Sequence, residues 1–126
     1  KGNYSWGSAI YLTGNYTNIT YSNFTNNYNS NNGTIAISGS NEMLENNIFI
    51  NNSAYNGGAV YIRKNENVTF DYNTFTKNNA GNNGGAVFIS DHANNTKIML
   101  YHLINNKSFS ILVAVIQFIH KTFLDN

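Results

Sequence analysis

The sequence predicts an all-β fold, a right-handed parallel β-helix (solenoid) of about four to five coils with roughly 25–28 residues in each. Two short motifs recur in a fixed order along the chain, with a spacing of about 25 to 28 residues between copies. Asn makes up roughly a fifth of the 126 residues, and Pro and Cys are absent. Asn mixed with β-branched and aromatic residues suits short strands broken by tight turns. The right hand is expected from the chirality of parallel crossovers.

The first motif is a turn followed by an apolar strand, and its copies occupy residues 7–12, 32–37, 57–62 and 84–89. Alternate residues of a strand share a face, so two aliphatic columns are expected to line the core. They are Ile10, Ile35, Val60 and Val87, and Leu12, Ile37, Ile62 and Ile89. The residues between these columns are expected to point outward: Tyr11, Ala36, Tyr61 and Phe88.

The second motif is Phe-x-x-Asn, with Leu in place of Phe in its last copy. Its copies are Phe24 with Asn27, Phe49 with Asn52, Phe75 with Asn78, and Leu103 with Asn106. We expect the four large apolar residues to stack inside the coils, beside a further column of Ile19, Leu44, Phe70 and Ile98. The asparagines are expected at turns in the left-handed conformation, with their amides joined in hydrogen-bonded ladders.

Two copies of the first motif begin with paired glycines, Gly57-Gly58 and Gly84-Gly85. Glycine permits backbone angles that are closed to other residues. We therefore interpret both pairs as structural, and the same applies to the asparagine column.

These residues resemble the repeats of polymorphic outer membrane proteins and of adhesin-like proteins with β-helix repeats. The residues that carry the resemblance are Gly57, Gly58, Ala59 and Val60 with Phe75 and Asn78; Gly84, Gly85, Ala86 and Val87; Phe24 with Asn27; and Phe49 with Asn52. The resemblance implies an exported, extracellular, surface-displayed protein that supports attachment to a protein or glycan of a host or neighbouring cell. It implies membrane association only through parts of a longer parent protein.

Composition argues against several other functions. The net charge is +1 and Arg63 is the only Arg, whereas phosphate backbones are bound by clusters of basic residues, so no nucleic-acid partner is expected. No metal-ligand spacing accompanies the three histidines, and no metal, cofactor or catalytic residue is expected. His92 falls in an insertion at residues 90–95, which we expect to form a loop. We do not expect an enzyme.

Two alternative functions remain open. A polysaccharide lyase or hydrolase needs paired carboxylates, and the repeat frame places only Glu45 beside Asp71 in this way. A carbohydrate-binding solenoid is the other alternative, in which Tyr11, Tyr61 and Phe88 stack on sugar rings. A flat ligand-binding face of outward threonines is not supported, because the candidate column reads Ala9, Thr34, Ala59 and Ala86.

The chain divides into residues 1–107, which carry the repeats, and residues 108–126, which do not. The tail keeps an apolar run but loses the paired glycines. We interpret it as a degenerate last coil or a cap that lays Ile111 and Val113 over the core, with unrelated sequence as the alternative. The whole chain is expected to be a fragment of a longer protein.

Overall fold

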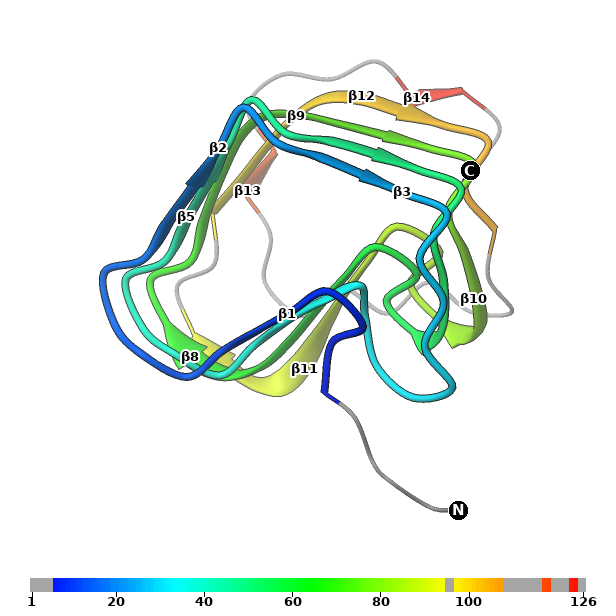
Figure 1. Cartoon of the computed structure of the whole chain (residues 1–126). Coiled ribbons are helices and arrows are strands. Elements are labelled where there is room, and N and C mark those ends of the chain that lie inside the picture. Colours follow the sequence, from blue (N-terminus) through cyan, green and yellow to red (C-terminus); the bar gives the residue numbers. More distant parts are fainter. Residues whose placement is uncertain (1–5, 95–96, 108–116, 119–122, 125–126) are drawn as a thin grey trace.

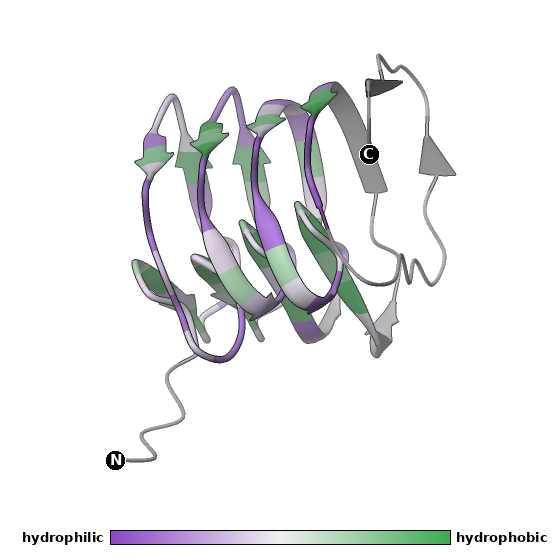
Figure 2. Ribbon diagram, turned by 90° about the vertical axis from the view of Figure 1, so that its right-hand side faces the viewer, coloured by the Kyte–Doolittle hydropathy of each residue, from purple (hydrophilic) through white to green (hydrophobic). Residues whose placement is uncertain are grey.

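The computed structural model describes residues 6–94, 97–107, 117–118 and 123–124. Within these ranges the chain is made of strands and turns, without a helix, and every strand pair is parallel. Successive coils stack face to face along one axis (Figures 1 and 2). The N-terminal coil lies nearest the viewer in Figure 1 and the chain turns clockwise as it recedes, so the solenoid is right-handed, as predicted.

One side of the solenoid is a four-stranded parallel sheet formed by the first motif. Its strands, in spatial order, are β1 (Ile10–Leu12), β4 (Ile35–Ile37), β8 (Val60–Glu66) and β11 (Val87–Asn94). The register joins Ile10 to Ile35, Ile35 to Val60, and Val60 to Val87, which confirms the predicted columns. The chain completes one turn of the solenoid between each of these four strands and the next. The described residues therefore make about three complete turns, fewer than the four to five coils expected.

Two further sides belong to one eight-stranded sheet. On the first of these sides lie β2 (Asn18–Thr20) and β5 (Met43–Glu45), and on the second lie β3 (Asn23–Thr25) and β6 (Ile48–Ile50). The longer strands β9 (Thr69–Thr76) and β12 (Lys97–Ile104) bend around the corner and pair on both sides. A fourth, short side holds β7 (Ser53–Asn56) and β10 (Asn79–Asn83).

The tail contributes two short strands to the described chain, β13 (Gln117–Phe118) and β14 (Phe123–Leu124). Both pair in parallel with β12, through Ile98 with Phe118 and through Leu103 with Phe123. Ile111 and Val113, which we expect over the core, lie outside the described residues. The assignment of residues 108–126 as a cap therefore stays a prediction.

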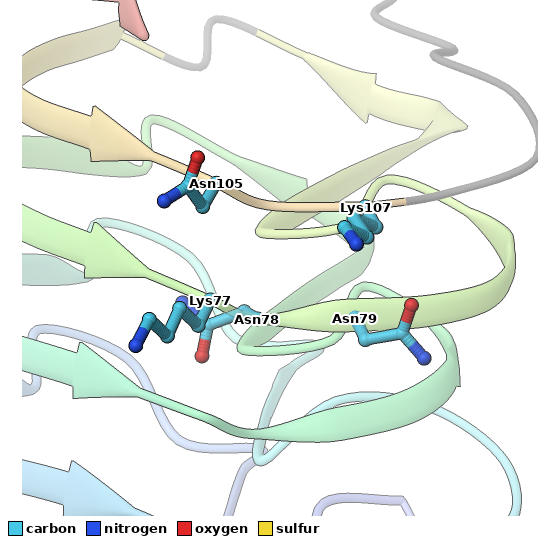
Figure 3. Close-up of a pocket in the computed structure, with 5 residues that line it drawn as sticks. All are labelled: Lys77, Asn78, Asn79, Asn105 and Lys107. Atoms are coloured by element: carbon cyan, nitrogen blue, oxygen red, sulfur yellow. The ribbon is translucent and has the colours of Figure 1, made fainter. Parts of the chain in front are cut away.

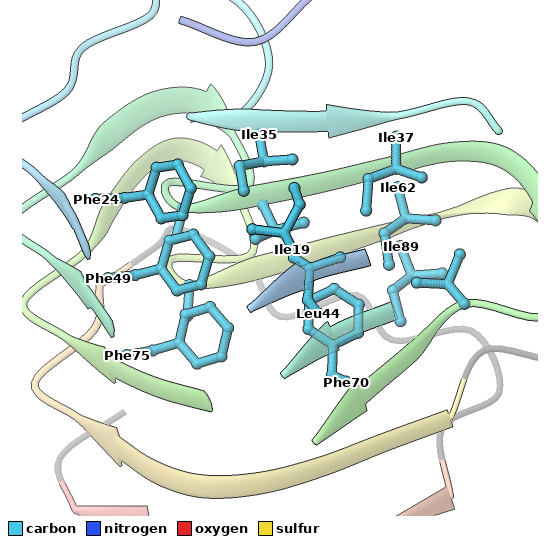
Figure 4. Close-up of a cluster of buried hydrophobic side chains, with 14 residues drawn as sticks. Ile19, Phe24, Ile35, Ile37, Leu44, Phe49, Ile62, Phe70, Phe75 and Ile89 are labelled. Carbon is cyan, nitrogen blue, oxygen red and sulfur yellow. The ribbon is translucent and has the colours of Figure 1, made fainter. Parts of the chain in front are cut away.

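The core is built from the predicted columns (Figure 4). The rings of Phe24, Phe49 and Phe75 stack with centroids 4.9 and 4.8 Å apart and interplanar angles of 10° and 5°. Leu103 continues this column and packs against the core. Phe70 lies beside the stack, with its ring centroid 6.5 Å from that of Phe75. The prediction that the Phe-x-x-Asn motif places its large residue inside is confirmed.

Each paired glycine has its own structural requirement. Gly57 and Gly84 lie in the left-handed region, with φ of 60° and 62°, as expected for the turn that precedes the strand. Gly58 is needed for a different reason, because a Cβ there would lie 2.2 Å from the carbonyl oxygen of Gly85 and 2.5 Å from that of Asn79. The second glycine thus allows the close approach of the next coil.

Residues 90–94 do not form the loop expected there. They continue strand β11, which pairs with β8 through His92 and Lys64 after a shift of register that follows Ile89. The Ser90 hydroxyl donates a hydrogen bond to the Arg63 carbonyl oxygen. A β-bulge absorbs an extra residue while the strands stay paired, and this is how the long coil is accommodated.

Candidate ligand-binding surface

The outer column of the first sheet is not the row of free side chains that the sequence suggested. Tyr11 is 41% exposed, but Phe88 is only 8% exposed and Ala36 is fully buried. The rings of Tyr61 and Phe88 stack on each other with centroids 5.5 Å apart. Ala36 and Phe88 are not part of the core cluster, in agreement with the predicted outward direction. They are nevertheless buried, so neither is a free side chain on the surface.

Trp6 accounts for the burial of Ala36. In the register, Ala36 lies between Tyr11 and Tyr61, and the small alanine leaves a gap between the two rings. The Trp6 ring lies 6.2 Å from that of Tyr11 and 6.0 Å from that of Tyr61, while the Arg63 guanidinium lies 4.5 Å over its face. The ring faces here contact one another, which leaves them little surface to offer a sugar.

The asparagine column is a ladder of buried side chains, in which each residue bonds to the next coil. The carboxamide of Asn52 accepts from the backbone N–H and the Nδ2 of Asn27, at 3.0 and 2.9 Å. Its own Nδ2 donates to the carbonyl oxygen of Phe24 at 2.8 Å and to Oδ1 of Asn78 at 3.0 Å. Asn78 repeats this pattern with Phe49 and Asn106.

The ladder asparagines are not the residues in the left-handed conformation, and that prediction is wrong by one position. The left-handed residues precede them at the same corner: Asn26, Asn51, Lys77 and Asn105. The residue with positive φ turns the chain, and this rotation directs the following side chain inward. A local preference of Asn for left-handed angles did not distinguish the two positions.

A second buried ladder, which the sequence analysis missed, runs along the corner between the two sides of the large sheet. Asn47 accepts from the Ser22 backbone N–H at 3.0 Å and donates to the Ile19 carbonyl oxygen at 2.8 Å. It also donates to Oδ1 of Asn73 at 3.1 Å. The 26-residue spacing of Asn47 and Asn73 was a signal, but it was hidden by the many other asparagines.

Glu42 stands at the third corner, where the pattern breaks. Its Oε2 accepts a hydrogen bond from the Thr17 backbone N–H at 2.8 Å, as a ladder asparagine would. The side chain is 1% exposed, and Oε1 is buried without a hydrogen-bond partner among the described residues. Oε1 and the Gly14 carbonyl oxygen lie on the same side of Gly39, and both are hydrogen-bond acceptors. At the asparagine corners, by contrast, a side-chain N–H donates to the equivalent carbonyl oxygen.

Apart from Tyr11, the exposed aromatic side chains among the described residues are tyrosines at the corners of the solenoid and on its short side. The most exposed are Tyr16, Tyr21 and Tyr28, at 78%, 79% and 71%. Tyr55 and Tyr72 are also more than half exposed. Exposed Tyr combines a rigid apolar ring with a polar hydroxyl, which suits contact with other molecules.

An open depression of about 500 Å³ lies where the second side of the large sheet meets the short side (Figure 3). It is lined by Lys77, Asn78, Asn79, Asn105 and Lys107. Asn78 belongs to the buried ladder, whereas the other four side chains are at the surface or half-buried. No acidic residue contributes to this lining among the described residues.

The structure places Glu45 beside Asp71 in the register of β5 and β9, as predicted. One carboxylate oxygen of Asp71 is buried and has no hydrogen-bond partner in the described chain. Within the described residues no group of three potential metal-binding side chains comes together. The column considered for a threonine face does not form a surface, because Thr34, Ala59 and Ala86 are buried and only Ala9 is exposed.

No protein family, no curated protein and no solved structure matches this chain. The resemblance to adhesin-like and polymorphic outer membrane protein repeats therefore stays a prediction from the two sequence motifs. The described part of the chain contains no helix with the length and apolar character needed to cross a bilayer.

Proposed function

We propose that this chain is a coil segment of a surface-displayed, adhesin-like protein, and that its outer surface contacts a protein or glycan of a host or neighbouring cell. The supporting observation is the arrangement of the exposed residues. Because equivalent positions stack in register, surface residues form columns along the axis, and several columns end in exposed Tyr. Stacked coils rise about 4.8 Å each, so one chain offers several contacts at a regular spacing.

The corner tyrosines allow a test that spares the fold. Tyr21, Asn46 and Tyr72 occupy one corner with φ of 49°, 55° and 50°. Tyr16 occupies another corner together with Asn41 and Asn67, again with positive φ. Asn therefore already fills the equivalent positions of neighbouring coils, and a Tyr→Asn change introduces a residue that tolerates the same backbone angles.

The experiment compares beads that carry the chain with beads that carry the triple variant Tyr16→Asn, Tyr21→Asn and Tyr72→Asn. Adhesion is measured on immobilised glycans, matrix proteins and cell layers. We expect the original chain to adhere and the variant to adhere less, with unchanged far-UV circular dichroism. Absence of adhesion by the original chain to every surface would contradict the proposal.

A further inference from the structure

We propose that the depression around Lys77 and Lys107 binds an anionic saccharide, a sugar chain that carries carboxylate or sulfate groups. This inference rests on the proposed attachment function and names a ligand class for it. Figure 3 shows the four outer side chains in two columns, with Asn105 above Lys77 and Lys107 above Asn79. The two lysines lie on different coils and in different columns, so their positive charges flank the depression diagonally.

The side chain of Asn105 is free because Lys77 interrupts an exposed asparagine ladder. Between the two preceding coils, Nδ2 of Asn51 donates to Oδ1 of Asn26 at 2.7 Å. Lys77 takes the next position in that column and offers only donors. The side chains of Asn105 and Asn79 have no hydrogen-bond partner among the described residues, so both carboxamides are available to a ligand.

The charges of the depression are not neutralised by the protein. Neither Lys77 nor Lys107 has a carboxylate within ion-pair distance in the described chain, and no acidic side chain lines the depression. Ammonium groups bind carboxylate or sulfate oxygens through charge-assisted hydrogen bonds. Carboxamides both donate and accept, as sugar hydroxyls do. A simple anion would use the lysines alone, whereas a charged sugar uses all four groups.

An exposed tyrosine shares a column of the backbone register with two residues that line the depression. The backbone register aligns Tyr28 with Ser53, Ser53 with Asn79, and Asn79 with Lys107. Three coil steps of about 4.8 Å make this column roughly 14 Å long. Tyr28, at 71% exposure, and the nearby Tyr55 offer rings on which the apolar face of a sugar packs. An extended oligosaccharide fits this column better than a single sugar.

The test uses the full 126-residue chain and calorimetric titration with three probes. They are oligogalacturonides, which carry carboxylates, heparin-derived oligosaccharides, which carry sulfates, and neutral maltooligosaccharides. We expect binding of at least one anionic probe and none of the neutral probe, and the two anionic arms identify the preferred group. The double variant Lys77→Gln and Lys107→Gln is expected to weaken that binding by about tenfold or more.

The matched control is the double variant Lys64→Gln and Lys97→Gln, which removes the same charge from strands β8 and β12. We expect its affinity to stay within about twofold of the original, because neither residue lines the depression and long-range attraction to a charged ligand is screened by salt. Equal losses in both double variants, equal binding of the neutral probe, or no binding of either anionic probe would overturn the site. If Lys77→Gln and Lys107→Gln leaves bead adhesion intact, the site is wrong while the attachment function stands.

Discussion

The buried asparagines at two corners of the solenoid show how one residue type can satisfy the backbone hydrogen bonds of stacked parallel coils. A ladder asparagine accepts from the coil before it with its oxygen, and its nitrogen donates to a carbonyl of that coil. Buried polar groups without partners are costly, so this reciprocity is what makes Asn suitable inside the solenoid. Glu42 accepts a backbone hydrogen bond in the same way, but its carboxylate has no N–H group to donate to a carbonyl oxygen.

The change Glu42→Gln is expected to stabilise the protein. By equivalence with Asn47 and Asn52, which donate to the carbonyls of Ile19 and Phe24, the new Nε2 should donate to the Gly14 carbonyl. Satisfying one buried group should raise the free energy of unfolding by about 1 kcal/mol, measured by urea denaturation. Glu45→Gln on the outer surface is the control, with a change below about 0.5 kcal/mol. A loss of stability confined to Glu42→Gln would show that the Gly14 carbonyl is not its partner.

The change Asn78→Ala is expected to be strongly destabilising. It removes the acceptor of the Asn52 backbone N–H and the donor to the Phe49 carbonyl, both in the interior. Each orphaned group costs about 1–3 kcal/mol, so we expect a loss of about 3 kcal/mol or more in chemical denaturation. Asn79→Ala is the same change at the adjacent exposed position and should cost under about 0.5 kcal/mol. Similar losses in both variants would refute the ladder as a source of stability.

The strands of the solenoid are short, several only three residues long, and are held in place by their neighbours on adjacent coils. The phenylalanine stack is the clearest case, because its rings repeat at the spacing of the coils and lie nearly parallel. Offset stacking of this kind adds about 0.5–1.5 kcal/mol per pair beyond burial. Each strand therefore depends on the coil before it and the coil after it.

Phe49→Ala, in the middle of the stack, is expected to lower the free energy of unfolding by about 3–5 kcal/mol. The ring is fully buried and contacts Phe24 on one side and Phe75 on the other. Thermal melting followed by circular dichroism measures the effect. Ile48→Ala, on the same strand but 39% exposed, is the control and should cost about 1 kcal/mol. If the control were as costly as Phe49→Ala, the stack would have no special role.

The molecule as a whole is a one-dimensional array in which each coil contacts mainly its neighbours. In such arrays, stability comes from the interfaces between repeats, and the ends need protection. Strand β12 is paired on its outer side by β13 and β14. Unpaired strand edges are templates for association with other chains.

Deletion of residues 108–126 is expected to lower the melting temperature and to cause association. The deletion removes both strands that pair with the outer side of β12 and so exposes its backbone donors and acceptors. Analytical ultracentrifugation over a range of protein concentrations, together with thermal melting, measures both effects. A shortened chain that stays monomeric and melts at the same or a higher temperature would show that the tail is no cap.

The sequence by itself determined the parallel solenoid, its period and the register of its inward columns. Repetition made this possible, because an in-register parallel stack places equivalent residues side by side, as Phe24, Phe49 and Phe75 do. The same reasoning identified the pairing of Glu45 with Asp71. These are properties of the backbone path, which the repeat encodes directly.

Only the tertiary structure decided how side chains outside the repeat pattern are used. Trp6 packs against Tyr11 and Tyr61, on either side of Ala36, and Ala36 is fully buried although alternation directs it outward. The depression between Lys77 and Lys107 likewise depends on residues that lie 30 positions apart and belong to different columns. The physical reason is that alternation gives the direction of a side chain, whereas its exposure depends on large neighbours that the repeat does not specify.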